Sequence, residues 1–243
     1  MTDESITAVI IRPVYTFSLG NNDVKTAASD GTSTICDITT TCDAIQPITL
    51  NFNLGCGGGT YGLKRTGQII WDGSVVLARF IECNPSTVRE KNVLEIGCGT
   101  CALPSHAVGY VGAKCIIATD THEEMQELQM NISRNSTLMN TKINAAPLDW
   151  RGYNITRFSP VNLDVLICAD VIYEISLESL VVLFNDLFLT NPHVEVYMAN
   201  TDRKHVRLFH RRFKDLLLFE EINSHKQDYP HVVIWKITNK LTS

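Results

Sequence analysis

The sequence predicts an α/β fold, with helices on both faces of a doubly wound, seven-stranded, mostly parallel sheet. Two observations carry this prediction. Strand-like and helix-like segments alternate from residue 71 to residue 217, which is the pattern of parallel strands joined by helical crossovers. The last two strand-like segments, 218–224 and 230–240, have no helix between them and therefore predict a C-terminal antiparallel β-hairpin.

The composition bounds the kind of protein. A chain of 243 residues that is 44% hydrophobic predicts one domain with elaborations. Its net charge of −5 argues against a dedicated nucleic-acid binder, and no apolar run approaches the roughly 18 residues of a membrane span. The acidic start lacks the basic region of a secretory signal, and eight scattered cysteines indicate reduced thiols. We expect a monomer of the cytoplasm or nucleus, bound to neither nucleic acid nor membrane.

Residues 1–45 are predicted to form an N-terminal extension, and residues 46–243 the main domain. The extension opens with a strand-like run, 7–19, and continues with the polar segment 20–44, which predicts a flexible excursion. Strand character resumes at 46–54, and the glycine-rich stretch 55–62 predicts a mobile turn, with a ligand-binding loop as the alternative.

The regular alternation starts at WDGSVVLARFIE (71–82), which predicts a helix with Asp72 as its N-cap. In the last helix-like segment, 203–214, three apolar residues share a stripe and cations lie opposite. That pattern is typical of a solvated surface helix, and docking to an acidic protein surface is the alternative. The remaining predicted strands are 92–97, 113–120, 143–150, 163–170 and 193–200, and the remaining helices are 103–111, 122–135 and 176–188.

The loop GCGTCA (97–102) can be interpreted in three ways: as a site for a dinucleotide, as a redox or metal site formed by cysteines, or as a site for a cationic ligand. Gly97, Gly99 and Ala102 fit the dinucleotide fingerprint G-x-G-x-x-G/A, and Asp120 follows at the distance of a ribose-binding acid. Cys98 and Cys101 also form a C-x-x-C pair. A zinc site needs four ligands, usually with a second close pair, and the chain has no second C-x-x-C. We therefore expect these cysteines to be packing thiols, with no metal.

Glu95 separates the two remaining interpretations. Two like charges about 4 Å apart repel by roughly 4 kcal/mol at an effective dielectric constant of about 20, so a pyrophosphate beside Glu95 would be disfavoured. S-adenosylmethionine carries a ribose, an adenine, an ammonium and a sulfonium group, and no phosphate. A helix also precedes the glycine strand, whereas dinucleotide domains usually open with that strand. The residues favour the methyl donor, and an NAD-binding Rossmann oxidoreductase is the alternative.

Five ordered motifs then carry a family resemblance. TGQIIWDGSVVLARFIE, VLEIGCGT, ATD, LDW and ADVIYE resemble the seven-stranded, Rossmann-like protein lysine methyltransferases of the methyltransferase-like family (family sixteen), over about residues 46–240. Two departures are Cys101, where the family has a third glycine, and Gly73–Ser74, where it often has Ala-Ala. A donor-binding interaction module with weak catalysis is therefore a further alternative.

The resemblance implies a cofactor, a substrate and a cofactor site. The cofactor is S-adenosylmethionine, and the substrate is a lysine of a non-histone protein of the chaperone, ATPase or translation-factor class. Asp120 would accept the ribose hydroxyls, Trp150 would flank the adenine, and Trp71 would lie near the methionine arm. The expected cofactor-binding residues are Trp71, Glu95, Gly97, Cys98, Gly99, Asp120, Trp150 and Ala169.

The expected catalytic residues are Asp170 and Tyr173, which form the family's D-x-x-Y element. They follow a central strand at its carboxyl end, where open α/β sheets bind ligands. Asp170 would orient the acceptor amine and Tyr173 would wall its channel. The related D/N-P-P-Y/F element of enzymes that methylate nucleobases has two prolines that are missing here, which disfavours a base as substrate.

Overall fold

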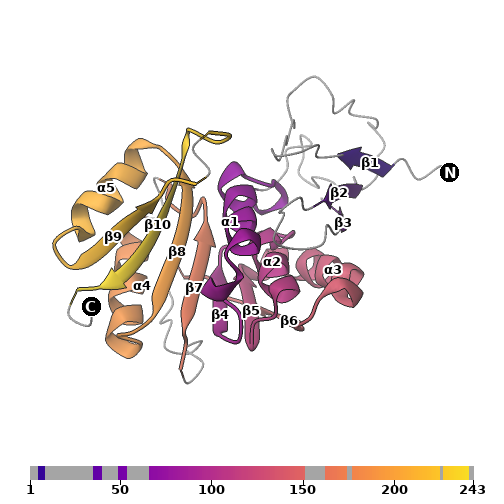
Figure 1. The fold of residues 1–243 in the computed structure, drawn as a ribbon, viewed down its shortest axis with the longest axis horizontal. Coiled ribbons are helices and arrows are strands. Elements are labelled where there is room, and N and C mark those ends of the chain that lie inside the picture. The colour runs from indigo at the N-terminus through magenta and orange to yellow at the C-terminus, as the bar shows by residue number, and fades with distance from the viewer. Residues whose placement is uncertain are drawn as a thin grey trace.

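The computed structural model describes residues 66–150, 162–173, 177–224 and 227–240, together with three short strands, Ser5–Ala8, Ile35–Thr39 and Thr49–Asn53. A seven-stranded sheet dominates the fold (Figure 1). Its strands in spatial order are β6 (Ile143–Pro147), β5 (Cys115–Asp120), β4 (Asn92–Ile96), β7 (Val165–Ala169), β8 (Glu195–Thr201), β10 (Val232–Asn239) and β9 (Leu217–Ile222).

The sheet is parallel from β6 to β8 and antiparallel beyond it. Strand β10 pairs antiparallel with both β8 and β9, so the last strand of the chain lies inside the sheet and β9 forms the edge. The predicted seven strands and C-terminal hairpin are confirmed. The spatial order reverses between β4 and β7, which is the switch point where open α/β sheets bind ligands.

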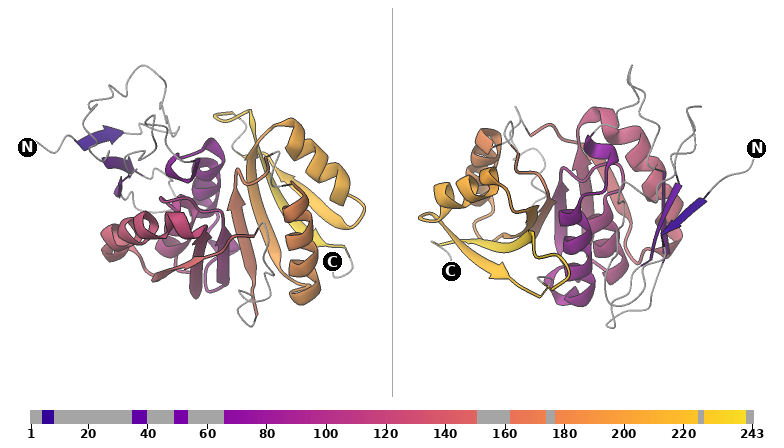
Figure 2. Two further views of the ribbon diagram at one scale, coloured as in Figure 1. Left: turned by 180° about the vertical axis from the view of Figure 1, so that it is seen from behind. Right: turned by 90° about the horizontal axis from the view of Figure 1, so that it is seen from above.

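Helices cover both faces of this sheet (Figure 2). Helices α1 (Asp72–Cys83), α2 (Leu103–Val111) and α3 (Met125–Asn135) pack on one face, and α4 (Leu177–Thr190) and α5 (Lys204–Phe213) pack on the other. Because successive strand residues point to opposite faces, Val93 joins the core under α1–α3 while Leu94 joins the core under α4 and α5. The predicted alternation of strands and helices is confirmed.

The start of α1 differs from the prediction. The N-cap is the extended residue Trp71, and Asp72 is the first helical residue, whose carboxylate lies 2.7 Å from Nε2 of His231. The backbone N–H of Gly73 in the first turn donates instead to Asp170, 97 residues away (2.8 Å). The prediction of Asp72 as the N-cap is wrong, and the carboxylate of Asp170, directly after β7, supplies the acceptor for the first turn.

A second, three-stranded sheet lies beside α2 and α3, in the order β1 (Ser5–Ala8), β2 (Ile35–Thr39) and β3 (Thr49–Asn53) (Figure 1). Strand β3 confirms the strand predicted there. Its Phe52 is buried and meets the ring of His106 edge-on, with centroids 5.2 Å apart. Within the segment predicted to be a flexible excursion, residues 35–39 form β2, which pairs with both of its neighbours. The glycine-rich stretch 55–62 lies outside the described residues.

Free and disulfide-bonded cysteines both occur among the described residues. Cys98, Cys101, Cys115 and Cys168 are free, and all but Cys115 are buried. Cys83, in the last turn of α1, is disulfide-bonded, so the expectation that all eight cysteines are reduced is wrong for this residue. None of the helices in the described part of the chain has the length and hydropathy needed to cross a bilayer.

Candidate active site

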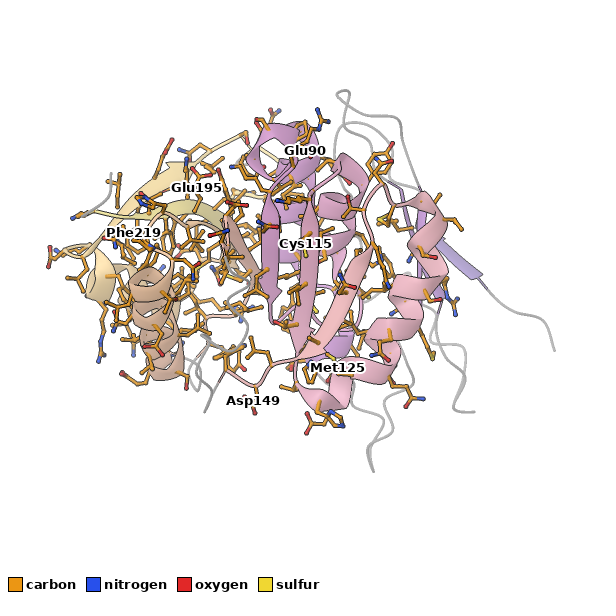
Figure 3. All side chains as sticks on the ribbon, turned by 90° about the horizontal axis from the view of Figure 1, so that it is seen from below. Glu90, Cys115, Met125, Asp149, Glu195 and Phe219 are labelled. Carbon is orange, nitrogen blue, oxygen red and sulfur yellow. The ribbon has the colours of Figure 1, made fainter. Side chains whose placement is uncertain are left out.

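The predicted site residues gather at the carboxyl ends of four neighbouring strands. Gly97–Gly99 follow β4, Asp120 ends β5, Ala169 and Asp170 lie at the end of β7, and Thr201 ends β8. Figure 3 marks the two ends of the sheet, with Glu90 before β4 and Asp149 after β6 on opposite sides. The site therefore lies at the switch point between β4 and β7.

The glycine loop needs glycine for both conformation and space. Gly97 and Gly99 have φ of +63° and +62°, in the left-handed region that side chains disfavour. A Cβ at Gly97 would come within 2.8 Å of Cγ1 of Val171, and one at Gly99 within 2.7 Å of the carbonyl oxygen of Gly67. The loop thus packs closely against the Val171 side chain and the Gly67 backbone at the carboxyl end of β4.

Asp120 connects β5 to this loop. Its Oδ2 accepts a hydrogen bond from the N–H of Gly99 (2.7 Å) and its Oδ1 accepts one from the N–H of Thr121 (2.7 Å). Each carboxylate oxygen can accept two hydrogen bonds, so these contacts are compatible with additional bonds from two hydroxyl groups. Asp120 is partly exposed at the carboxyl end of β5. Its geometry suits the predicted contact with a ribose.

Glu95 lies deeper than the sequence suggested. Its side chain is only 1% exposed, and its Oε2 accepts hydrogen bonds from the N–H (2.9 Å) and hydroxyl of Ser105 in the first turn of α2. Desolvation by burial raises the pKa of its carboxyl group to about 8. The group is therefore largely protonated at pH 7, and the repulsion of a phosphate on which the sequence argument relied is weaker than expected.

Asp170 joins three elements. Its Oδ2 accepts the hydrogen bond from Gly73 of α1, its Oδ1 accepts one from Thr201 at the end of β8 (2.8 Å), and its N–H donates to Ala199 (2.9 Å). A Cβ on Gly73 would collide with Oδ2 of Asp170 and come within 3.0 Å of the carbonyl oxygen of Ala199. Glycine at position 73 therefore leaves room for the Asp170 carboxylate beside the first turn of α1.

The other predicted acceptor-site residue, Tyr173, is 40% exposed, whereas Val171 and Ile172 before it are buried. Sequence reasoning missed Asn200 beside them. Its side chain is buried, its Oδ1 accepts a hydrogen bond from the N–H of Ile172 (3.4 Å), and its Nδ2 has no partner among the described residues. A polar residue at the carboxyl end of a strand was the signal that could have found it.

The two predicted tryptophans have different surroundings. The indole N–H of Trp71 donates to the carbonyl of Thr66 (3.2 Å), and the guanidinium carbon of Arg203 lies 5.3 Å from its ring centre. Trp150 is 8% exposed and belongs to the core under α4. Sequence reasoning also missed Gly67, whose carbonyl accepts a hydrogen bond from the N–H of Thr100 (2.7 Å). It belongs to the TGQ stretch at the start of the first motif.

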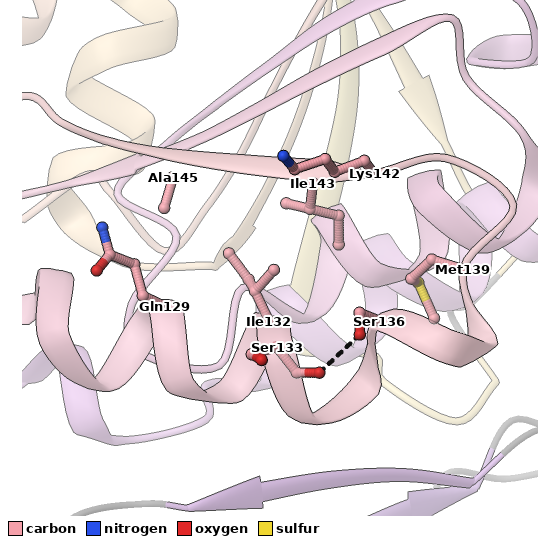
Figure 4. Close-up of a pocket in the computed structure, with 8 residues that line it drawn as sticks. All are labelled: Gln129, Ile132, Ser133, Ser136, Met139, Lys142, Ile143 and Ala145. Atoms are coloured by element: carbon pink, nitrogen blue, oxygen red, sulfur yellow. Dashed lines mark hydrogen bonds between the residues drawn. The ribbon is translucent and has the colours of Figure 1, made fainter.

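A cavity of about 490 Å³ lies elsewhere, between α3 and β6 (Figure 4). None of the predicted site residues lines it, so it is not the predicted donor site. The cavity is lined by Gln129, Ile132, Ser133, Ser136, Met139, Lys142, Ile143 and Ala145.

No cluster of three or more potential metal-ligating side chains occurs within the described residues, Cys98 and Cys101 included.

The fold matches that of solved methyltransferases. The ribosomal protein L11 methylase from Lactobacillus delbrueckii subsp. bulgaricus superposes with a TM-score of 0.52 at 16% sequence identity, over 71% of this chain and 81% of that protein. At this identity the match concerns the fold alone. The sheet order and the glycine loop after β4 are those of a Rossmann-like methyltransferase.

The chain belongs to the lysine methyltransferase family, whose model matches residues 52–218. It is 34% identical to the protein-lysine methyltransferase METTL21E from Bos taurus over 168 residues, which is 65% of this chain and 56% of that protein. It is 29% identical to the protein-lysine N-methyltransferase EFM3 from Chaetomium thermophilum over 57% of this chain and 43% of that protein. The chain thus spans about half the length of these curated relatives.

The methyl donor of this family is S-adenosylmethionine. The residues present fit it. Gly97 and Gly99 supply the positive-φ turn after β4 and allow close packing on Val171 and Gly67, and the Asp120 carboxylate stands at the end of the neighbouring strand. The family membership favours the methyl donor over the dinucleotide more strongly than the charge of Glu95 does.

Proposed function

We propose that this protein transfers a methyl group from S-adenosylmethionine to the side-chain nitrogen of a lysine in a non-histone protein. One observation carries the proposal. The donor-type residues at the ends of β4 and β5 lie beside the D-x-x-Y element at the end of β7, on adjacent strands of one sheet. Donor and acceptor would therefore meet at the switch point.

We assign the donor contacts as follows. The backbone of Gly97–Gly99 supports the amino-acid arm, and the Asp120 carboxylate accepts the ribose hydroxyls. Trp150 and the small Ala169 flank the adenosine. Trp71 lies near the methionine arm, held by its hydrogen bond to Thr66. Glu95 acts from below the loop by fixing the start of α2 through Ser105.

The chemistry requires a neutral amine aligned with the methyl group. Bound S-adenosylmethionine supplies the methyl group on a positively charged sulfur. A lysine has an ordinary pKa near 10.4, so freeing its lone pair at pH 7 costs roughly 4.6 kcal/mol. Burial in the channel beside a positive charge lowers this cost because both disfavour the ammonium form. Alignment of donor and acceptor supplies on the order of 7–11 kcal/mol toward the barrier.

Asp170 and Tyr173 provide that alignment. Each oxygen of Asp170 already accepts one backbone hydrogen bond and can accept another, so the carboxylate can orient the amine without leaving α1. The exposed ring of Tyr173 forms the wall of the lysine channel. With the amine held by Asp170, the new N–C bond would form as the C–S bond of the bound donor breaks, and the sulfur would keep that electron pair.

The substrate and the surroundings belong to the same proposal. The target is a chaperone, an ATPase or a translation factor, and the protein acts as a monomer in the cytoplasm or nucleus. Purified protein incubated with cell lysate and tritiated S-adenosylmethionine, followed by mass spectrometry of the labelled band, tests it directly. An Asp120→Asn variant is the control for donor dependence.

The outcomes separate the alternatives. Methyl-lysine in a protein band supports the proposal, and methyl-arginine corrects the acceptor. Label in RNA or in a small metabolite, with none in protein, overturns the substrate class. Calorimetry with the methyl donor and with a dinucleotide distinguishes the two remaining alternatives. Donor binding without any transfer favours an interaction module, and dinucleotide binding without a response to the methyl donor favours an oxidoreductase.

A further inference from the structure

Helix α5 has two faces of opposite character. Val206, Phe209 and Phe213 are buried, and the ring of Phe209 meets that of Phe184 on α4 edge-on at 5.3 Å. His210 packs against Phe219 of β9, which Figure 3 labels among the side chains on this side of the sheet (centroids 4.8 Å apart). These contacts fix the rotation of the helix, so its opposite face must point to solvent.

The solvent face carries a row of four cations, called here the basic stripe: Lys204, Arg207, Arg211 and Lys214. All four are exposed. At about 100° per residue they fall within about 80° of one another around the helix axis, and they span roughly 15 Å along it. The ammonium of Lys240 lies at the carbonyl of Lys214 and extends the positive charge at the far end.

The stripe is poorly neutralised by the protein itself. Segment 203–214 holds six Lys and Arg residues and no acidic residue, in a chain of net charge −5. Two of these six cations have acidic partners: Arg207 pairs with Asp202 (2.9 Å), and Arg212, beside the stripe, pairs with Glu178 of α4 (2.8 Å). Within the part of the chain that the structure describes, no acidic side chain forms an ion pair with Lys204, Arg211 or Lys214.

The repulsion within the stripe opposes helix stability, although the helix dipole favours the cations of the last turn, Arg211 among them. Like charges three or four residues apart destabilise a helix by about 0.2–0.5 kcal/mol per pair. The four residues of the stripe form three such pairs, one after another along the helix. Lys204 also adds a cation to the first turn, where the helix dipole favours anions, and that turn has no acidic residue. A helix that only faced water would gain from acidic residues on the same face, so the stripe points to an acidic binding partner.

The stripe begins at the candidate active site. Helix α5 follows β8 after two residues, and the N–H of Thr201 at the end of β8 is bound by Asp170. Arg203, directly before the stripe, lies over the ring of Trp71. Figure 1 shows α5 leaving the end of β8 and running outward from there. A bound segment could therefore reach from the stripe to the acceptor site.

We propose that the basic stripe docks an acidic segment of the protein substrate next to the lysine to be methylated. The inference rests on the proposed function. A span of roughly 15 Å corresponds to about five extended residues, so the segment is a short run rich in Asp and Glu. A protein is favoured over a nucleic acid because the chain as a whole is acidic and its family acts on lysine.

The test measures binding of the full chain to a fluorescein-labelled ten-residue glutamate-rich peptide by fluorescence anisotropy at low salt. A peptide with glutamine at every glutamate position and a single-stranded RNA of equal charge serve as competitors. The Lys204→Glu/Lys214→Glu variant reverses two charges of the stripe. The matched control, Lys114→Glu/Lys142→Glu, reverses two exposed lysines directly before β5 and β6, at the end of the strand order opposite to β9.

The acidic peptide should bind the wild type, release with rising salt and outcompete the glutamine peptide. The stripe variant should bind it about tenfold more weakly, since each exposed ion pair contributes modestly, and the control variant should bind as the wild type does. Equal weakening in both variants, no binding at low salt, or preference for the RNA would overturn the docking proposal. Donor binding by calorimetry, expected to be unchanged in both variants, reports on the proposed function separately.

Discussion

Removing the carboxylate of Asp170 should destabilise the fold and slow the transfer of the methyl group. That side chain accepts backbone N–H groups from Gly73 and Thr201, both at 2.8 Å, and so joins β7 to α1 and β8. Asp170 itself has a φ of +51°, a conformation that Asp and Asn tolerate and Ala disfavours. The Asp170→Ala variant therefore loses two charged hydrogen bonds and gains backbone strain.

The magnitude follows from these contacts. A hydrogen bond to a charged group contributes about 1.5–3 kcal/mol, so the two bonds together contribute about 3–6 kcal/mol. Asp170 is only partly buried, and water can satisfy part of the freed N–H groups. We therefore take the lower end, about 3 kcal/mol, for the loss in the free energy of unfolding. Asp170→Asn keeps one acceptor oxygen and the tolerance of positive φ, and should lose about half as much.

Urea denaturation, calorimetry with S-adenosylmethionine and a methyl-transfer assay together read out the effects. Asp170→Asn should remain folded at 25 °C and bind the donor within a few-fold of the wild type. Its transfer rate should fall about 10²-fold, because a reacting group misplaced by about 1 Å can cost that much. Gly73→Ala provides a coupling check. It should destabilise the wild type but cost less beside Asp170→Ala, where the colliding oxygen is gone.

Three results would refute this reasoning. An Asp170→Ala variant that unfolds at the same urea concentration as the wild type would mean that the carboxylate does not hold α1. A stable Asp170→Asn variant with full transfer would remove Asp170 from the acceptor site. Loss of donor binding in a folded Asp170→Asn variant would make it a cofactor residue instead.

Three further predictions concern the loop. Because burial raises the pKa of Glu95 from 4.5 to about 8, the folded form keeps a proton that the unfolded form releases, so stability falls as the pH rises from about 4.5 to about 8. The free energy of unfolding should fall by up to about 5 kcal/mol over this pH range. Urea titrations at successive pH values should show a much smaller fall for Glu95→Gln. An equal dependence on pH in the wild type and the variant would contradict the raised pKa. Asp120→Ala should weaken donor binding by about 1–3 kcal/mol in calorimetry, and unchanged affinity would exclude the ribose contact. Elemental analysis should find no stoichiometric zinc at Cys98 and Cys101; finding it would reverse their assignment as packing thiols.

Much of the fold was determined by local patterns in the sequence. Helix and strand periodicity and turn residues act over a few positions, so the segments that became β4, α2, β5 and α3 were predicted close to their final bounds. The positions of the glycine loop, Asp120 and Asp170 also followed from local rules, because such residues end strands at the same edge of a parallel sheet.

The tertiary structure decided what depends on partners far apart in the chain. Burial of Glu95 beneath α2 raises its pKa and removes the charge that the sequence argument assumed. The Asp170–Gly73 contact replaces the predicted cap at Asp72, and the insertion of β10 between β8 and β9 sets the sheet edge. No local pattern encodes these features, because desolvation and hydrogen-bond partners depend on which distant segments pack together.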